Sequence, residues 1–327
     1  MTSYLSNRLS KLQYVNNYFS GIATIFMLHR VSGFEKNKLP PNENMKVSPE
    51  FLEKFISDLK SQGYEFISID ILHEILQKGK NIKKQIVFTL DDGYLDNYTH
   101  AYPILKKHNV PFTIYITTSF PENSAILWWY ILEDLIMENK EILLSNGEKY
   151  SCKTSEEKIK TFMVIREKII TLDQNYFLNQ LNELLSHYYI DWKKKCQELV
   201  MNWEQIIDLS KDELCTIAGH TKNHLTLNKL SDKEIIDEVI QANKLLEKKI
   251  GKQIEHFAYP FGSQNEIGQR EFNIVKSLGF KTVTTTRLGN IYTEHRNHLE
   301  CLPRIMLTED FQLTSIGRIR KEKVVTL

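Results

Sequence analysis

The stretch "VFTLDDGYLDN", residues 87–97, places two adjacent carboxylates directly after an apolar run. Residues 85–90 are rich in β-branched and aromatic side chains, which predicts a buried strand. Asp91, Asp92 and Gly93 follow at the carboxyl end of that strand. The triplet fits a polar turn. In a parallel α/β protein it also fits a functional site, because catalytic groups gather where the strands end.

Strands and helices alternate on both sides of this stretch. Further strands are predicted at residues 21–29, 64–69, 111–117, 214–220, 256–262 and 280–286. Helices are predicted at residues 48–63, 70–79, 94–109 and 231–251, and the last of these begins with a capping box formed by Ser231 and Glu234. This alternation indicates a parallel sheet, either open or closed into a barrel.

Residues 124–212 interrupt the alternation with a segment that has a mainly helical pattern. No linker rich in Gly, Pro or Ser flanks the segment, so we interpret it as an insertion rather than as a free domain. The chain is therefore expected to form one domain, residues 1–327, with the insertion built into it.

Composition excludes several classes of protein. Lys and Arg total 42 and Asp and Glu total 41, so the charge gives no reason to expect a nucleic-acid partner. The four cysteines are far apart and form no CxxC pair, which favours a reducing compartment over a disulfide framework. Residues 19–28 are apolar but too short to span a membrane, and no cleavage site follows them. We therefore expect a cytoplasmic protein without a transmembrane segment.

The first 18 residues carry leucines at roughly helical spacing. They predict an amphipathic helix that either packs on the barrel or makes peripheral contact with a membrane. The sequence gives no indication of the oligomeric state.

A second candidate site lies in "GHTKNH", residues 219–224, just after the strand predicted at residues 214–220. The spacing of His220 and His224 suits two imidazoles on one metal ion, although such a pair also occurs by chance on surfaces. One Asp with two His is a common zinc ligand set that leaves a position open for water or substrate. The other Asp of the adjacent pair is then free to act as a base toward that water.

Together with "FTLDDG" and "GHTKNH", the stretch "FAYPFG" (residues 257–262) resembles a motif set of the polysaccharide deacetylases of carbohydrate esterase family four. The opening "FMLHRV", residues 26–31, resembles the permuted subset that includes biofilm-polysaccharide deacetylases. The resemblance implies a distorted (β/α) barrel of about seven parallel strands and a divalent metal ion, with Zn²⁺ expected. It implies Asp91 as catalytic base, Asp92, His220 and His224 as metal ligands, and His29 as general acid.

The third motif departs from the family pattern because Ala258 stands where an arginine usually steadies the base. Arg304 is a candidate replacement, or else a charge at the surface or at a strand end. The resemblance implies that the Phe261 N–H stabilises the oxyanion, and we expect Tyr259 and Pro260 to contact substrate. Trp128 and Trp129 are expected either to stack on sugar rings or to form the core of the insertion.

The predicted function is removal of acetyl groups from N-acetylated amino sugars in surface-polysaccharide or glycan biosynthesis, with an acetylated sugar or oligosaccharide as substrate. Two alternatives stay open. One is a catalytically inactive carbohydrate-binding protein on the same fold, which the missing arginine motivates. The other is an O-acetyl esterase.

Overall fold

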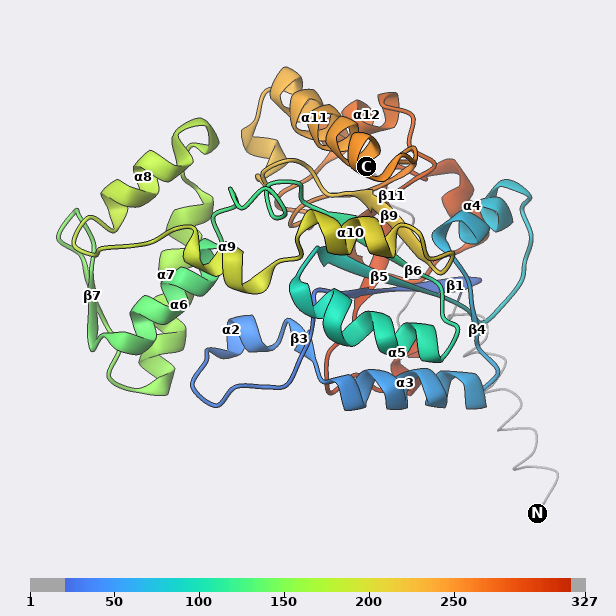
Figure 1. Ribbon diagram of the computed structural model, residues 1–327, viewed down its shortest axis with the longest axis horizontal. Helices are drawn as coiled ribbons and strands as arrows, with labels where there is room; N and C mark the ends of the chain where they lie inside the picture. Colours follow the sequence, from blue (N-terminus) through green and yellow to red (C-terminus); the bar gives the residue numbers. More distant parts are fainter. Residues whose placement is uncertain (1–20, 319–327) are drawn as a thin grey trace, which may run out of the picture.

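A computed structural model describes residues 21–318, so the helix expected within the first 18 residues lies outside the described part. Its centre is a closed barrel of parallel strands (Figure 1). Going round the barrel, the seven strands are β1 (Ala23–Leu28), β12 (Leu302–Met306), β11 (Thr282–Leu288), β10 (His256–Ala258), β9 (Cys215–Gly219), β6 (Phe112–Ile116) and β5 (Gln85–Asp92). The ring closes because β1 pairs with both β12 and β5. The predicted barrel is confirmed.

The sequence did not predict every strand correctly. β12 was missed, and so was the small parallel pair of β2 (Arg30–Val31) and β3 (Lys46–Val47). The strand expected at residues 64–69 is reduced to β4 (Glu65–Phe66), which pairs with the start of β5. It ends early because the Ser68 side chain accepts a hydrogen bond from the Ile71 N–H and begins the next helix.

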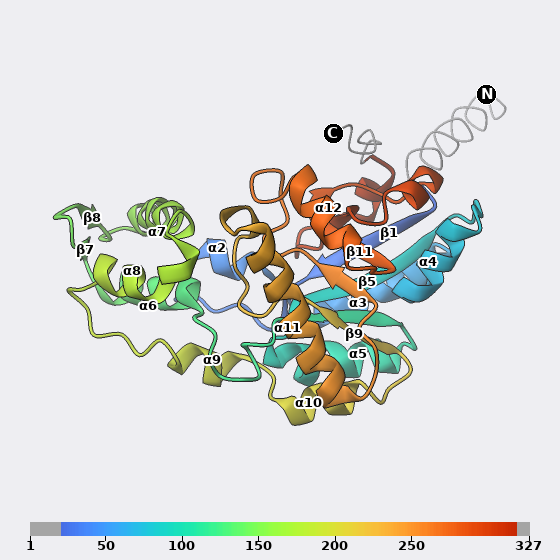
Figure 2. The ribbon, with the colours of Figure 1, turned by 90° about the horizontal axis from the view of Figure 1, so that it is seen from above.

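Helices cover the outside of the barrel (Figure 2). They are α3 (Pro49–Ser61), α4 (Ile69–Gln77), α5 (Tyr102–Lys107), α10 (Trp203–Leu209), α11 (Asp232–Ile250) and α12 (Gln269–Ser277), with the short α2 (Pro40–Glu43) beside the mouth. The predicted capping box begins α11, and Gly251, with a φ of 70°, ends it. The helix expected at residues 94–109 instead begins with a π-helical turn, Asn97–Ala101, and α5 then starts at Tyr102 with Pro103 in its first turn.

The insertion forms a compact unit with its own apolar core (Figure 1, green). It contains α6 (Trp128–Glu138), a hairpin of β7 (Glu141–Leu143) and β8 (Lys149–Ser151), α7 (Ser155–Ile170), α8 (Phe177–Leu184) and α9 (Lys194–Leu199). The hairpin was not predicted. Helix α10 lies within the expected boundary of residues 124–212, but its Ile206 and Leu209 pack into the barrel core.

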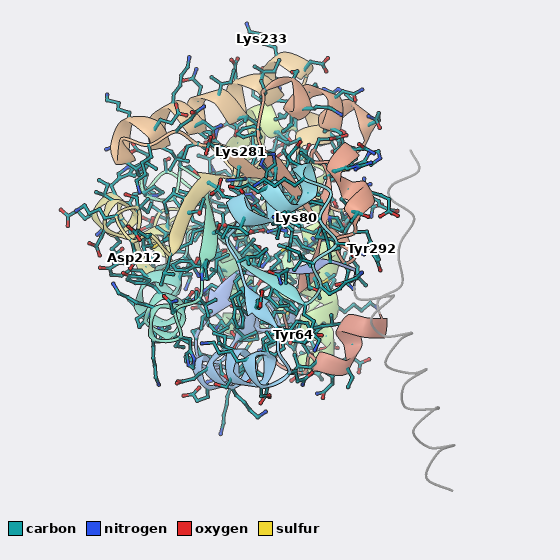
Figure 3. The ribbon with its side chains drawn as sticks, turned by 90° about the vertical axis from the view of Figure 1, so that its right-hand side faces the viewer. Tyr64, Lys80, Asp212, Lys233, Lys281 and Tyr292 are labelled. Atoms are coloured by element: carbon teal, nitrogen blue, oxygen red, sulfur yellow. The ribbon has the colours of Figure 1, made fainter. Side chains whose placement is uncertain are left out.

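The insertion stands at the carboxyl end of the barrel strands. Figure 3 shows the opposite end of the molecule, where the labelled Tyr64, Asp212 and Lys281 lie just ahead of β4, β9 and β11. Figure 1 places α6, α7 and α8 at the other end, next to the ends of the strands. Within residues 21–318, no helix is long and apolar enough to cross a membrane.

The core under β5 depends on a cluster of aromatic rings. Phe88 is 1% exposed, and its ring stacks 5.8 Å from those of Phe26 and Phe66. We expect Phe88→Ala to lower the free energy of unfolding by about 3–5 kcal/mol, because the surrounding rings cannot collapse into the cavity. Phe34→Ala is the matched control, since Phe34 is 47% exposed and its loss should cost less than about 0.5 kcal/mol. Denaturant unfolding of both variants measures the difference, and equal costs would contradict this account of the core.

Candidate active site

The two adjacent carboxylates lie where β5 leaves the barrel. Asp91 pairs in register with Tyr115 and Asp92 with Ile116 of β6. Asp92 has a φ of 78° and Gly93 a φ of 95°, so the extended backbone stops abruptly at this point. A left-handed aspartate is uncommon and is typical of functional sites. Both carboxylates are buried, and both interact electrostatically with His29.

Asp92, His220 and His224 are brought together at the barrel mouth. The Asp92 Oδ1 lies 3.4 Å from His220 Nε2 and 3.2 Å from His224 Nε2. The ligand atoms of the three residues all lie within 4.8 Å of one another. The sequence therefore identified a true spatial cluster from segments more than a hundred residues apart.

The donor set fits a divalent cation. His220 Nδ1 is 2.8 Å from the Ala258 carbonyl oxygen, so it carries the proton and leaves the Nε2 lone pair facing Asp92. The Asp92 Oδ1 is buried and has no hydrogen-bond partner within residues 21–318. A buried carboxylate oxygen facing imidazole lone pairs is costly unless a cation is bound between them.

A buried glutamate shapes the loop that carries the two histidines. Thr221 and His224 have φ values of 63° and 56°, so the loop is tightly folded. Glu238 on α11 accepts hydrogen bonds from the backbone N–H groups of Lys222 and Asn223 and from the Asn223 side chain. Sequence reasoning missed Glu238, because an acidic residue in an amphipathic helix looks like part of its solvated face.

Arg304 forms a bidentate pair with Asp91 inside the barrel. Its two terminal nitrogens each donate to one carboxylate oxygen at 2.7 Å, and its side chain is fully buried. The same guanidinium also donates to the Thr89 hydroxyl and the Thr285 carbonyl. Burial alone would raise the pKa of Asp91, but the Arg304 guanidinium outweighs this effect and holds the pKa below its usual range. Of the two interpretations of Arg304, the surface charge is therefore excluded.

His29 lies at the end of β1, facing the carboxylates. The Asn97 side chain donates to the His29 carbonyl at 2.9 Å, and Asp96 accepts from the Val31 N–H. Burial lowers the pKa of His29, although Asp92 and Asp91 oppose this shift. The protonated form of such a histidine is a readily donating acid. The stretch 87–97 thus also supplies the anchors of His29, which the sequence did not reveal.

The motif around Phe261 forms a tight turn at the mouth. Phe261 has a φ of 60°, and its ring lies 4.9 Å from that of His224. A hydrogen bond from the Gly262 N–H to the Pro260 carbonyl closes the turn at 2.7 Å. The Phe261 N–H itself has no acceptor within the described chain, so it is available for a ligand.

The structure does not support the expected substrate contact of Tyr259, whereas that of Pro260 stays a prediction. Both residues are buried, and the Tyr259 ring packs against Phe257 and Phe272 beneath α12. The Tyr259 hydroxyl donates to the Glu300 carbonyl at 3.1 Å. The Tyr259 side chain is therefore part of the core rather than the mouth.

The two tryptophans divide between core and cavity. Trp128 is buried in the core of the insertion, whereas the Trp129 ring lies 5.8 Å from that of His224. Both border a cavity of about 300 Å³ that His224 and Phe261 also line. Of the two tryptophans, Trp129 is the one placed to contact a molecule bound at the cluster of Asp92, His220 and His224.

The buried Arg304–Asp91 pair leads to a stability prediction. Arg304→Met should lower the free energy of unfolding by about 3–5 kcal/mol, because it leaves the Asp91 carboxylate buried without a partner. Adding Asp91→Asn to that variant should recover part of the loss, since no buried charge is then left unpaired. Denaturant unfolding of the single and double variants measures this, and a strictly additive double variant would contradict direct coupling.

Comparisons with known proteins agree with this geometry. The family model described as "Polysaccharide deacetylase" matches residues 78–146 and 156–283, which is more than half of the chain. The poly-beta-1,6-N-acetyl-D-glucosamine N-deacetylase of Staphylococcus aureus is 22% identical over 268 residues, covering 82% of this chain and 70% of that protein.

Two solved structures share the fold. The Streptococcus pyogenes deacetylase PplD in complex with acetate has a TM-score of 0.60 at 18% identity, covering 91% of this chain and 98% of that one. IcaB from Ammonifex degensii has a TM-score of 0.59 at 17% identity, covering 91% and 97%. The family match includes the Asp91–Asp92 pair, the two histidines and the Phe261 turn. The chain therefore belongs to the polysaccharide deacetylase family of hydrolases, as its motifs predicted.

Proposed function

We propose that this chain is a divalent-metal-dependent hydrolase that removes acetyl groups from N-acetylated amino sugars of a surface polysaccharide or related glycan. The observation that carries the proposal is the ionised Asp91, held by Arg304 beside the cluster of Asp92, His220 and His224. The relative from Staphylococcus aureus is named for poly-beta-1,6-N-acetyl-D-glucosamine. That name supports β-1,6-linked N-acetylglucosamine oligomers as the first substrates to test.

Each residue of the site has a chemical task in this reaction. A divalent ion, with Zn²⁺ proposed, would act as a Lewis acid that polarises the acetyl carbonyl and acidifies the attacking water. Asp91 takes the proton of that water, and the Arg304 pair keeps Asp91 ionised for this purpose. The free Phe261 N–H stabilises the negative charge that develops on the carbonyl oxygen. His29 protonates the nitrogen as the amine leaves.

The alternative of an inactive carbohydrate-binding protein loses its motivation. That alternative arose because Ala258 replaces the arginine of the family motif. Arg304 from β12 supplies the guanidinium instead, with two 2.7 Å contacts to the base. The site therefore has a base, its partner and a candidate acid, which supports turnover rather than binding alone.

The cellular setting stays a prediction. We propose a cytoplasmic location from the sequence, and the chemistry of the site does not depend on it. An acetylated glycan is equally a substrate for this site whether or not the protein contacts a membrane surface.

The first functional prediction concerns the base. Asp91→Asn should lower acetate release by about 10²–10⁴-fold, because the amide that replaces the carboxylate cannot accept the proton of water. The measurement is free acetate and free amine from acetylated sugar oligomers and, for comparison, O-acetyl sugars. Asp58→Asn, on the outer helix α3, is the matched control and should leave the rate unchanged.

Metal removal completes this test. The Asp91→Asn protein should still bind one equivalent of Zn²⁺, whereas chelation of the wild type should abolish activity and added Zn²⁺ or Co²⁺ should restore it. Activity that survives full chelation would contradict the proposed metal dependence. Release from O-acetyl sugars alone would favour the esterase alternative.

The second functional prediction concerns His29. His29→Ala should reduce hydrolysis of N-acetyl sugars by about 10²–10⁴-fold, because an amine leaves only after protonation. An activated aryl acetate should be affected much less, since its phenolate leaves without an acid. Steady-state rates on both substrates test the role, and equal losses on the two would argue against His29 as the acid.

A further inference from the structure

The cavity beside the metal cluster extends away from the reacting residues and beneath the insertion. His224 and Phe261 line it from the barrel, and residues 174–179, which form the turn before α8 and the first residues of α8, line it from the insertion. Asp91, Asp92 and His29 do not line it. We call this space the insertion cleft, and its described walls are made by Ser119, Phe120, Ser124, Ala125, Ile126, Trp128, Trp129, Ile170, Gln174, Asn175, Tyr176, Phe177, Leu178, Asn179, Asn223, His224, Leu225, Thr226 and Phe261.

The lining combines aromatic faces with neutral polar groups. Trp129 contributes a ring from α6, and Tyr176 contributes a ring from the turn that precedes α8 and is 63% exposed. Asn179 adds an amide to the insertion wall. The Ser119 hydroxyl is buried against the barrel wall and has no hydrogen-bond partner within the described chain. Rings with an apolar face, together with amides and hydroxyls, match the C–H faces and hydroxyl edges of a sugar.

The lining also carries no strong charge. Apart from His224, none of the described residues around the insertion cleft is ionisable near neutral pH. Phosphate groups are normally bound by Arg, Lys or helix N-termini, and burying them without such partners is costly. The cleft is therefore poorly suited to a nucleotide diphosphate or a pyrophosphate, and well suited to a neutral glycan.

The turn that forms the insertion wall of the cleft is held in place by its own hydrogen bonds. Gln174 donates to the Leu172 carbonyl at 2.8 Å, and the Asp173 N–H donates to Gln180 at 2.9 Å. The Asn175 N–H donates to the Asp173 carboxylate at 2.9 Å, so the turn is fixed by its own hydrogen bonds. A surface fixed in this way binds without a large ordering cost.

We propose that the insertion cleft is a binding subsite for a neutral sugar unit next to the one that is deacetylated, with Tyr176 as its stacking platform. This inference rests on the proposed function, because it takes the metal cluster as the place of reaction. In this proposal, the insertion recognises an oligomeric, uncharged glycan. A nucleotide-activated monosaccharide would leave the cleft unused.

Binding and turnover test the subsite separately. Using the Asp91→Asn protein, tryptophan fluorescence titrations would compare a β-1,6-linked N-acetylglucosamine pentamer, the monosaccharide and its nucleotide diphosphate derivative. We expect the pentamer to bind at least about tenfold tighter than the monosaccharide, and the nucleotide sugar no tighter. Tyr176→Ala should reduce the preference for the pentamer roughly 3- to 10-fold, and Tyr176→Phe should restore it, because the ring provides the contact.

Tyr189→Ala is the matched control, because Tyr189 also lies on the insertion, is 99% exposed and does not line the cleft. It should change neither binding nor the preference. Three results would each overturn the subsite. They are equal affinity for the monosaccharide and the pentamer, tighter binding of the nucleotide sugar, and a Tyr176→Ala protein that keeps the full preference for the pentamer. If the preference is present while the wild type releases no acetate, the subsite holds and the proposed reaction fails. If acetate is released without any preference, the reaction holds and the subsite fails.

Discussion

The active site depends on a charged pair sealed inside the barrel. Arg304 and Asp91 meet through two 2.7 Å contacts, and water reaches almost none of either side chain. Removing two charges from water is expensive, and the cost is offset only when the geometry is good and the remaining donors are satisfied. Thr89 and Thr285 accept those donors here. The pair favours the ionised form of Asp91, and the proposed mechanism uses this carboxylate as the base beside the cluster of Asp92, His220 and His224.

Barrel closure explains how an arginine from the last strand can serve this purpose. β1 pairs with β5 on one side and with β12 on the other, so only one strand separates Asp91 from Arg304. The arginine expected on β10 is replaced by Ala258, whose carbonyl instead fixes the tautomer of His220. A positive charge thus reaches Asp91 from β12 instead of β10.

The insertion gives this barrel a second recognition surface. It has its own apolar core, and Arg30, which follows His29 in the chain, donates to the Tyr130 hydroxyl on α6 and pairs with Asp96. His29, the end of β1 and helix α6 are therefore linked through one buried network of polar contacts. Such a link holds the neutral, aromatic walls of the insertion cleft at a fixed distance from the reacting residues.

The sequence by itself determined the features that depend on neighbouring residues: the strand ending in Asp91 and Asp92, the His220–His224 pair and the capped helix at Ser231. Hydrophobic patterning and local spacing are enough for these, and the motif resemblance added the barrel and the roles of the residues. The tertiary structure alone decided that Arg304 meets a carboxylate 213 positions away, that Tyr259 turns into the core, and that residues 174–179 line the same cleft as His224. The reason is physical, because burial and pairing are set by which surfaces the closed barrel and the insertion bring together.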